Sequence, residues 1–356
     1  MDRAFYLGLA EHGHALPMGT DLVLHEHEDA QAILTDGQRL GEVLAETARR
    51  FNSPLALPHM DLELEKIQLL TMLGVPAADL AAYHFTSTPT ADTFATLQQH
   101  LQDPFVPRLQ AHIDSIRYIA EHTDLLPVGM SIGPFSLLTK LVPDPITPIC
   151  LAGAGLSADD EEEINTIEQV MELGIRLILR SVKAQIDAGA KAIFIAEPAA
   201  NRVYFSPNQI EDGAEIFDHY VMAFNRQLKA YLEERQVDLI FHCCGELTDY
   251  FVRKFAELDP VLLSLGSSRK LWEDARLVSP HTVLYGNLPS KQFYSDGLIT
   301  VEQVQQQSQV LITKMREVGH PFILGTECDV LSVPGCEPTI RRKVQAIARM
   351  ALCCVV

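Results

Sequence analysis

The sequence predicts a single α/β domain with the fold of a (β/α)8 TIM barrel and an N-terminal helical extension. Short apolar runs alternate with longer amphipathic stretches, and strands that are apolar throughout are typical of parallel sheets covered on both faces. The 356 residues are enough for one large barrel, and no Gly/Ser-rich or Pro-rich linker divides them. We expect a helical region over residues 1–52 and the barrel over residues 53–356.

Seven apolar runs flanked by turn residues are the expected strands. In chain order they are Pro54–Leu57, Pro127–Ile132, Ala192–Ala196, Val237–His242, Val261–Leu265, Val283–Gly286 and Phe322–Gly325. An eighth strand would close the barrel, but no other run stands out, and residues 83–95 are too irregular to assign. No G-x-G-x-x-G motif follows the first strand, which argues against a dinucleotide-binding sheet.

Helical stretches lie between most of these strands, with apolar residues at helical spacing. They are residues 28–51, Glu162–Asp187, Gln209–Arg235, Leu247–Leu258, Arg269–Val278, Val301–Val318 and Thr339–Cys353. Helical crossovers make successive strands parallel, so the carboxyl ends of all strands should gather at one rim of the barrel.

The charge and cysteine content narrow the classes of function. The chain has 28 Lys and Arg against 47 Asp and Glu, a formal net charge of −19, so it should repel nucleic acids and anionic membranes. It begins with no signal-peptide pattern and has no membrane-length apolar run. We therefore expect a cytoplasmic protein. Its seven cysteines are odd in number and thinly spread, which favours thiol or metal chemistry over a disulfide framework.

Soft metal ligands lie at two strand ends of the expected catalytic rim. His242 and Cys244 are two apart and share one face of their strand, whereas Cys243 points away. Cys328 follows the last strand, and Cys336 is an alternative third ligand. One imidazole and two thiolates suit Zn²⁺ with an open fourth position. The alternative is that these cysteines are small buried hydrophobic residues and the histidine is hydrogen-bonded in the core.

Four other polar residues at strand ends are candidates for the site. Glu197 would orient substrate or accept a proton, or else cap a helix. Asn287 would hydrogen-bond substrate, or else stabilise a turn. His59 and Asp61 are candidates for contacting a cofactor, and Asp61 could instead begin a helix as its N-cap.

Six segments together resemble the uroporphyrinogen decarboxylase-like superfamily. They are residues 54–75, 128–142, 188–200, 239–247, 282–288 and 323–335. Within it, the chain resembles the zinc-dependent methyltransferases that use methylated corrinoid proteins, such as methylcobalamin:coenzyme M methyltransferases. The resemblance implies a (β/α)8 barrel and a Zn²⁺ ion on His242, Cys244 and Cys328. It further implies methyl transfer from methylcobalamin, held by a partner corrinoid protein, to a small thiol activated as a zinc thiolate.

The chain departs from two patterns of this superfamily. The decarboxylase branch carries an N-terminal arginine-rich signature, whereas residues 11–30 contain no arginine. Some methyltransferases carry a zinc-binding carboxylate after the fifth strand, where this chain has Gly266-Ser267-Ser268. Water, Glu197 or Glu327 would then complete the zinc site. A tetrapyrrole decarboxylase of the uroporphyrinogen type and a non-catalytic zinc- or corrinoid-binding protein remain the alternative functions.

Overall fold

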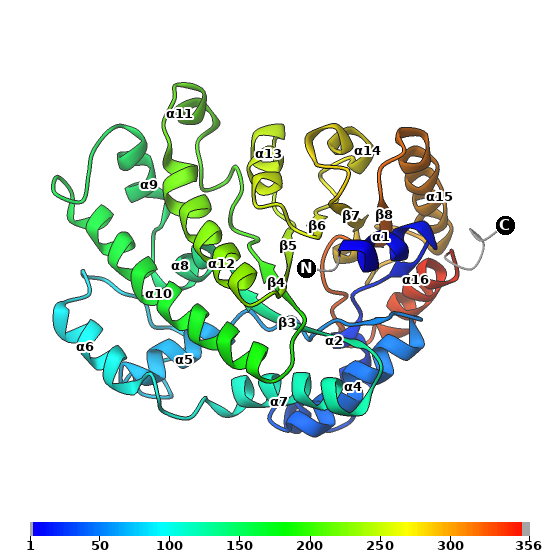
Figure 1. The fold of residues 1–356 in the computed structure, drawn as a ribbon, viewed down its shortest axis with the longest axis horizontal. Helices are drawn as coiled ribbons and strands as arrows, with labels where there is room; N and C mark the ends of the chain where they lie inside the picture. The colour runs from blue at the N-terminus through cyan, green and yellow to red at the C-terminus, as the bar shows by residue number, and fades with distance from the viewer. Residues whose placement is uncertain (1–2, 351–356) are drawn as a thin grey trace.

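The computed structural model describes residues 3–350, and one sheet of eight parallel strands lies at its centre. The strand order is β1-β8-β7-β6-β5-β4-β3-β2, the order that a (β/α)8 barrel produces. The sheet is curled, and helices surround it (Figure 1). The predicted fold class is confirmed.

All seven predicted strands form, and their ends differ from the predicted ends by at most two residues. They are β2 (Leu55–Ala56), β3 (Leu126–Ile132), β4 (Ala192–Ala196), β5 (Asp238–Cys243), β6 (Leu262–Leu265), β7 (Val283–Leu288) and β8 (Phe322–Thr326). Alternate side chains point into the barrel, where Met130, Phe194 and Ile240 form part of one buried cluster. The opposite faces of the strands pack against the surrounding helices.

The eighth strand lies in the region that the sequence predicted to be only helical. It is β1 (Ala15–Leu16), which pairs in parallel with β8 through Ala15–Leu324 and Leu16–Gly325. Two residues are too few to show a strand pattern in the sequence, so β1 depends on its partner for its conformation. Residues 1–52 therefore contribute to the sheet. The strand pairing described for residues 3–350 does not join β1 to β2, but Leu16 and Leu55 belong to the same interior cluster.

The helices cover the outer face of the sheet and extend beyond it. They are α1 (Arg3–Glu11), α2 (Thr20–Leu24), α3 (Ala30–Ile33), α4 (Gly37–Arg50), α5 (Leu64–Met72), α6 (Ala91–His100), α7 (Pro107–His122), α8 (Pro134–Leu141), α9 (Ile146–Gly153), α10 (Glu162–Asp187), α11 (Pro207–Glu211), α12 (Ala223–Glu234), α13 (Asp249–Glu257), α14 (Leu271–Asp274), α15 (Val301–Val318) and α16 (Glu337–Met350). A short π-helix, η1 (Asp218–Met222), precedes α12 directly, and two short 3-10 helices are η2 (Ala275–Leu277) and η3 (Ser290–Gln292).

Two predicted helices keep their predicted bounds, and two others are interrupted. Helices α10 and α15 match the prediction, and α15 begins with a capping box on Thr300. The helix predicted over residues 28–51 is divided into α3 and α4. Asp36 is the N-cap of α4, because its side chain accepts a hydrogen bond from the Arg39 amide. The stretch predicted as Gln209–Arg235 is likewise broken after α11, where Gly213 has a φ of 94°. The predicted last helix ran to Cys353, which, like Cys354, lies outside the described residues.

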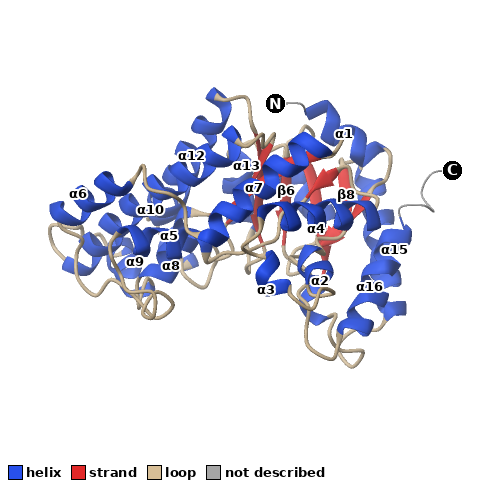
Figure 2. Cartoon of the chain, turned by 90° about the horizontal axis from the view of Figure 1, so that it is seen from below, coloured by secondary structure: helices blue, strands red, loops and turns tan. Residues whose placement is uncertain are grey.

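A lobe of helices extends from one side of the barrel. It contains α5, α6, α8, α9 and part of α10, and it projects to the left in Figure 2. Helix α10 contacts α5, α8 and α9 within the lobe and β3 in the sheet, so one long helix joins the two parts. The Arg180 guanidinium of α10 lies 4.0 Å from the centre of the Phe105 ring, a cation–π contact between α10 and the segment that joins α6 to α7.

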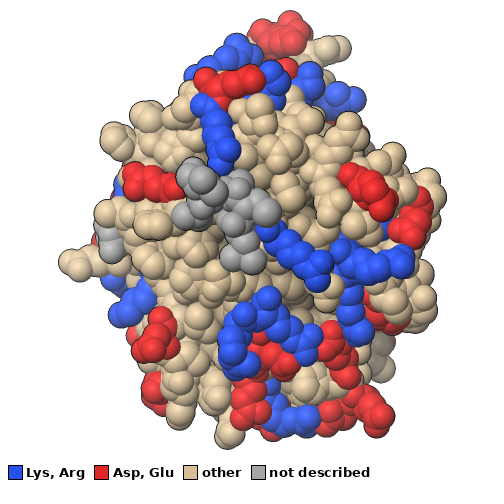
Figure 3. Space-filling model, turned by 90° about the vertical axis from the view of Figure 1, so that its right-hand side faces the viewer, with Lys and Arg blue, Asp and Glu red and all other residues tan. Residues whose placement is uncertain are grey.

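The acidic excess does not produce a uniformly negative surface. On the face shown in Figure 3, Lys and Arg lie among Asp and Glu. Ion pairs on α16 include Arg341 with Glu26 at 3.0 Å and Arg342 with Asp296 at 3.2 Å. In the part of the chain that the structure describes, no helix is both long enough and apolar enough for a membrane span.

Candidate metal centre

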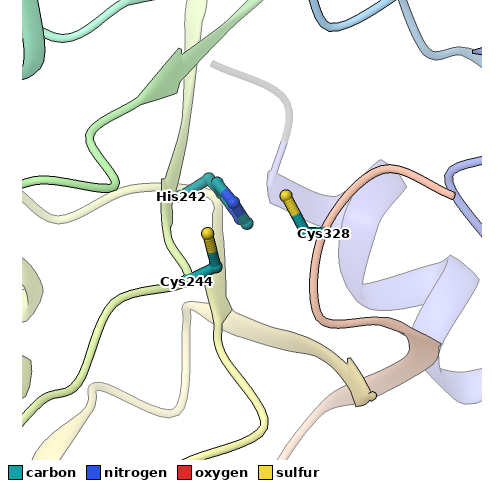
Figure 4. A group of neighbouring side chains, drawn as sticks. All are labelled: His242, Cys244 and Cys328. Carbon is teal, nitrogen blue, oxygen red and sulfur yellow. The ribbon is translucent and has the colours of Figure 1, made fainter. Parts of the chain in front are cut away.

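His242, Cys244 and Cys328 come together at the carboxyl rim of the barrel. His242 is near the end of β5 and Cys244 directly follows it, while Cys328 lies just beyond β8. Curling of the sheet brings these strand ends to one point, and the three side chains converge in Figure 4. The ligand atoms of the three residues all lie within 4.8 Å of one another. The structure thus assembles the three residues that the sequence predicted as zinc ligands.

The neighbouring cysteine has a different environment, as the alternation of a strand requires. The Cys243 side chain is fully buried in the core between the sheet and the helices, and its thiol contacts the Ala200 carbonyl at 3.7 Å. Burial raises the pKa of Cys243 well above its usual value, so this thiol stays protonated. Cys336 packs against the same core and is not a member of the three-residue group.

The imidazole of His242 is oriented by a residue that the sequence did not reveal. Ser264 lies opposite His242 in the β5–β6 ladder, and its Oγ is 2.8 Å from His242 Nδ1. When Ser264 accepts from Nδ1–H, the lone pair is on Nε2. This Nε2 is buried and has no hydrogen-bond partner among the described residues. An unpartnered buried polar atom costs about 1–3 kcal/mol, and a metal ion on Nε2 would remove that cost.

The two thiols interact with each other. A hydrogen bond from the Cys328 thiol is the largest cause that lowers the pKa of Cys244, and the neighbouring His242 side chain lowers it further. The same bond between the thiols raises the pKa of Cys328. The pair therefore tends to hold one proton between two sulfurs. A divalent cation would replace that proton and satisfy both sulfurs as thiolates. Together with the unpartnered Nε2 of His242, this donor set fits Zn²⁺.

Two further side chains adjoin the thiols. Met60 follows β2, and its Sδ lies 4.0 Å from Cys328 Sγ. Lys291 lies in η3 after β7, and its Nζ is 3.4 Å from the Cys244 carbonyl oxygen. Met60 lies just after the expected strand Pro54–Leu57, but no sequence pattern places its sulfur beside Cys328. Lys291 lies five residues beyond the expected strand end at Gly286.

The Glu327 carboxylate, although next to Cys328, is directed towards the loop after β6. It accepts hydrogen bonds from the Ser267 amide at 3.1 Å and the Ser267 hydroxyl at 2.7 Å. No carboxylate of residues 3–350 joins the group formed by His242, Cys244 and Cys328. Glu327 thus holds the β6 and β8 loops together.

Glu197 is fully buried at the end of β4, and its carboxylate faces the start of α8. The two oxygens accept from the amides of Phe135 at 2.9 Å and Ser136 at 3.1 Å, which are orphan donors in the first turn of that helix. Burial raises the pKa of Glu197 to about 7, and the amide donors act in the opposite direction. The Glu197 amide also donates to the His242 carbonyl at 2.8 Å, so Glu197 links the α8 start to β5.

Asn287 is buried at the end of β7 and ties a loop to the strand. Its Nδ2 donates to the carbonyl oxygens of Gly266 at 2.8 Å and Arg269 at 2.9 Å. These bonds hold the loop after β6 in place near the rim. A contact of Asn287 with substrate stays a prediction.

His59 and Asp61 lie on either side of Met60 and are each paired. His59 Nε2 is 3.1 Å from Asp21 Oδ1, and Asp61 forms an ion pair with Arg108 at 2.5 Å. Burial lowers the pKa of His59, but the bond to Asp21 and the nearby carboxylates outweigh it, so the net shift is upward. Asp61 also accepts from the Glu63 amide at 3.1 Å, just before α5. Both residues adjoin the rim without belonging to the metal-ligand group.

Comparisons with known proteins agree with this architecture. The fold is similar to the solved structure of a methyltransferase from Methanosarcina mazei, with a TM-score of 0.66, 16% identity, and coverage of 97% of this chain and 98% of that chain. A B12-independent methionine synthase from Shewanella sp. W3-18-1 gives a TM-score of 0.45 at 13% identity, covering 67% of this chain and 66% of that one.

At these identities the structural likeness concerns the fold alone. A comparison of the sequence with curated proteins finds no match. The sequence model described as uroporphyrinogen decarboxylase (URO-D) matches residues 82–337, which is more than half of the chain. The chain belongs to the uroporphyrinogen decarboxylase (URO-D) family.

Proposed function

We propose that this protein transfers a methyl group from a methylated corrinoid, carried by a partner protein, to a small thiol. Zn²⁺ would be held by His242, Cys244 and Cys328. The observation that carries the proposal is that the ligand atoms of His242, Cys244 and Cys328 all lie within 4.8 Å of one another at the carboxyl rim. In addition, His242 Nε2 is buried without a hydrogen-bond partner among the described residues. The similarity in fold to a Methanosarcina methyltransferase over nearly the whole of both chains supports it.

Each residue of the centre has a distinct task in this proposal. Bound Zn²⁺ would lower the pKa of an incoming thiol and hold it as a thiolate. Ser264 keeps His242 Nε2 aimed at the ion. Cys244 and Cys328 contribute two negative charges, which reduce the Lewis acidity of the ion and favour a nucleophilic thiolate. This donor set suits alkyl transfer to sulfur better than hydrolysis.

Decarboxylation of a tetrapyrrole is the alternative that the family description raises. Such a substrate is a polyanion, and each carboxylate would need a cationic or amide donor. Near the rim, the Arg108 guanidinium pairs with Asp61, and Arg269 pairs with Asp249 and Asp274. These arginines are already engaged by the protein's own carboxylates, which favours the thiol as substrate.

The experiment is an assay of methyl transfer by the zinc-loaded protein. Methylcobalamin is supplied as donor with coenzyme M, homocysteine or 2-mercaptoethanol as acceptor, and the methyl thioether is measured by mass spectrometry. We expect turnover with at least one of these thiols, its loss in Cys244→Ala, and its retention in Cys150→Ala, whose cysteine is exposed and lies in α9 of the helical lobe. Zinc binding without turnover would indicate a non-catalytic protein. Loss of carboxylates from a porphyrinogen would indicate the decarboxylase.

A further inference from the structure

We propose that Met60 supplies the fourth zinc ligand of the resting protein through its thioether sulfur. The inference deepens the proposed function and rests on its zinc site. Met60 Sδ lies 4.0 Å from Cys328 Sγ. Two ligand sulfurs at about 2.3 Å from one tetrahedral zinc ion lie about 3.8 Å apart. The observed separation is therefore close to that of two sulfurs sharing one ion.

The residues on either side of Met60 favour this orientation. His59 is held by Asp21, and Asp61 is held by Arg108. With both neighbours engaged elsewhere, the side chain between them is the one that reaches Cys328. His59 and Asp61 therefore have a positioning role, because their interactions fix the backbone on both sides of Met60.

The acidic candidates for the fourth position are engaged away from it. Glu327 accepts two hydrogen bonds from Ser267, and Glu197 caps the first turn of α8. No Asp or Glu of residues 3–350 belongs to the group of converging ligand atoms. Met60 is half-buried, and its sulfur is in contact with a member of that group.

The chemistry of a thioether suits a site that must accept another sulfur. Thioether and thiolate are both soft donors that zinc accepts, but the thioether is neutral. It adds no negative charge to a centre that already has two thiolates. Methionine is also unbranched and flexible, so its side chain can move aside without disturbing the strand. Met60 would thus shield the fourth position from water while leaving it open to a substrate thiolate.

The test is zinc X-ray absorption on the full chain, produced with selenomethionine and loaded with zinc. A selenium scatterer should appear in the first shell of zinc in the resting protein. It should vanish in Met60→Leu and persist in Met130→Leu, whose methionine lies inside the barrel. Leucine replaces methionine with little change in volume, so both variants should fold. Adding 2-mercaptoethanol should replace the selenium scatterer by a sulfur scatterer.

The possible outcomes distinguish a failure of the Met60 assignment from a failure of the proposed function. Zinc with an oxygen scatterer and no selenium in the wild-type protein would overturn the role of Met60 and leave the three-ligand site intact. A protein that takes up no zinc at all would overturn the proposed function itself. Unchanged selenium scattering in Met60→Leu would place another methionine at the ion and would also contradict the inference.

Discussion

The Ser264 hydroxyl lies 2.8 Å from His242 Nδ1, across the ladder between β5 and β6. This contact selects the ring nitrogen that is left for a metal. It also limits rotation of the imidazole, whose other nitrogen, Nε2, is buried without a hydrogen-bond partner among the described residues. The site is thus prepared by a strand neighbour as well as by the three ligands.

Replacing Ser264 with alanine should weaken zinc binding without abolishing it. Loss of an outer-shell partner of a ligating histidine typically lowers metal affinity about 10–100-fold. Competition against a chromogenic chelator would measure the change. Ser308→Ala is the matched control, because that serine is also fully buried but bonds to the Val304 carbonyl within α15. Equal zinc affinity in the two variants would contradict the role assigned to Ser264.

Replacing Glu327 with glutamine should leave the zinc content unchanged but lower the free energy of unfolding. The carboxylate accepts two bonds from Ser267 and is not part of the ligand group. A neutral amide accepts such bonds less strongly, so a loss of about 1–2 kcal/mol is expected in urea unfolding. Loss of zinc from this variant would instead identify Glu327 as a ligand.

Gly133→Ala should be strongly destabilising. A Cβ at this position would lie 1.8 Å from Glu197 Oε2, and that carboxylate is fixed by its two bonds to the start of α8. Forcing the two apart should cost about 1–3 kcal/mol or more in unfolding free energy. Gly8→Ala in α1 is the control, because its Cβ would meet no atom within 4 Å. Comparable stabilities of the two variants would show that Glu197 can move.

The buried Glu65 should make stability fall as the pH rises. Burial raises the pKa of Glu65 to about 7, although Ser131 and Ser181 donate to its carboxyl. The folded protein then holds this proton more tightly than the unfolded chain does. Stability therefore decreases from about pH 4.5 to pH 7 and levels off above, by up to about 3 kcal/mol.

Glu65→Gln removes one of the titrating protons and should make this part of the stability curve less steep, while the buried carboxyls of Glu197 and Asp329, whose pKa values are also raised to about 7, still contribute to it. The nearby Asp61 is paired with Arg108 and is retained in the variant. Urea unfolding at a series of pH values would compare the two slopes. The same slope between pH 5 and pH 7 in both proteins would show that Glu65 does not titrate there.

The sequence predicted the ligands because they lie on strands with a clear apolar pattern. His242, Cys244 and Cys328 could be placed at one rim as soon as their strands were recognised as parallel. β1 could not be predicted, because a two-residue strand such as Ala15–Leu16 has no pattern of its own and forms by pairing with β8. The contacts of Ser264 with His242 and of Met60 with Cys328 could not be predicted, because they depend on strand register and on the curling of the sheet. Neither property is visible in a single sequence.

The amount of zinc bound by the purified protein is the most direct test of the proposed centre. Elemental analysis should find about one zinc per chain in the wild-type protein. Cys244→Ala should lose most of it, while Cys243→Ala should retain it, because the thiol of Cys243 points into the core. Less than about 0.2 zinc per wild-type chain after careful purification, or equal zinc in the two cysteine variants, would contradict the zinc centre and the methyl transfer proposed for it.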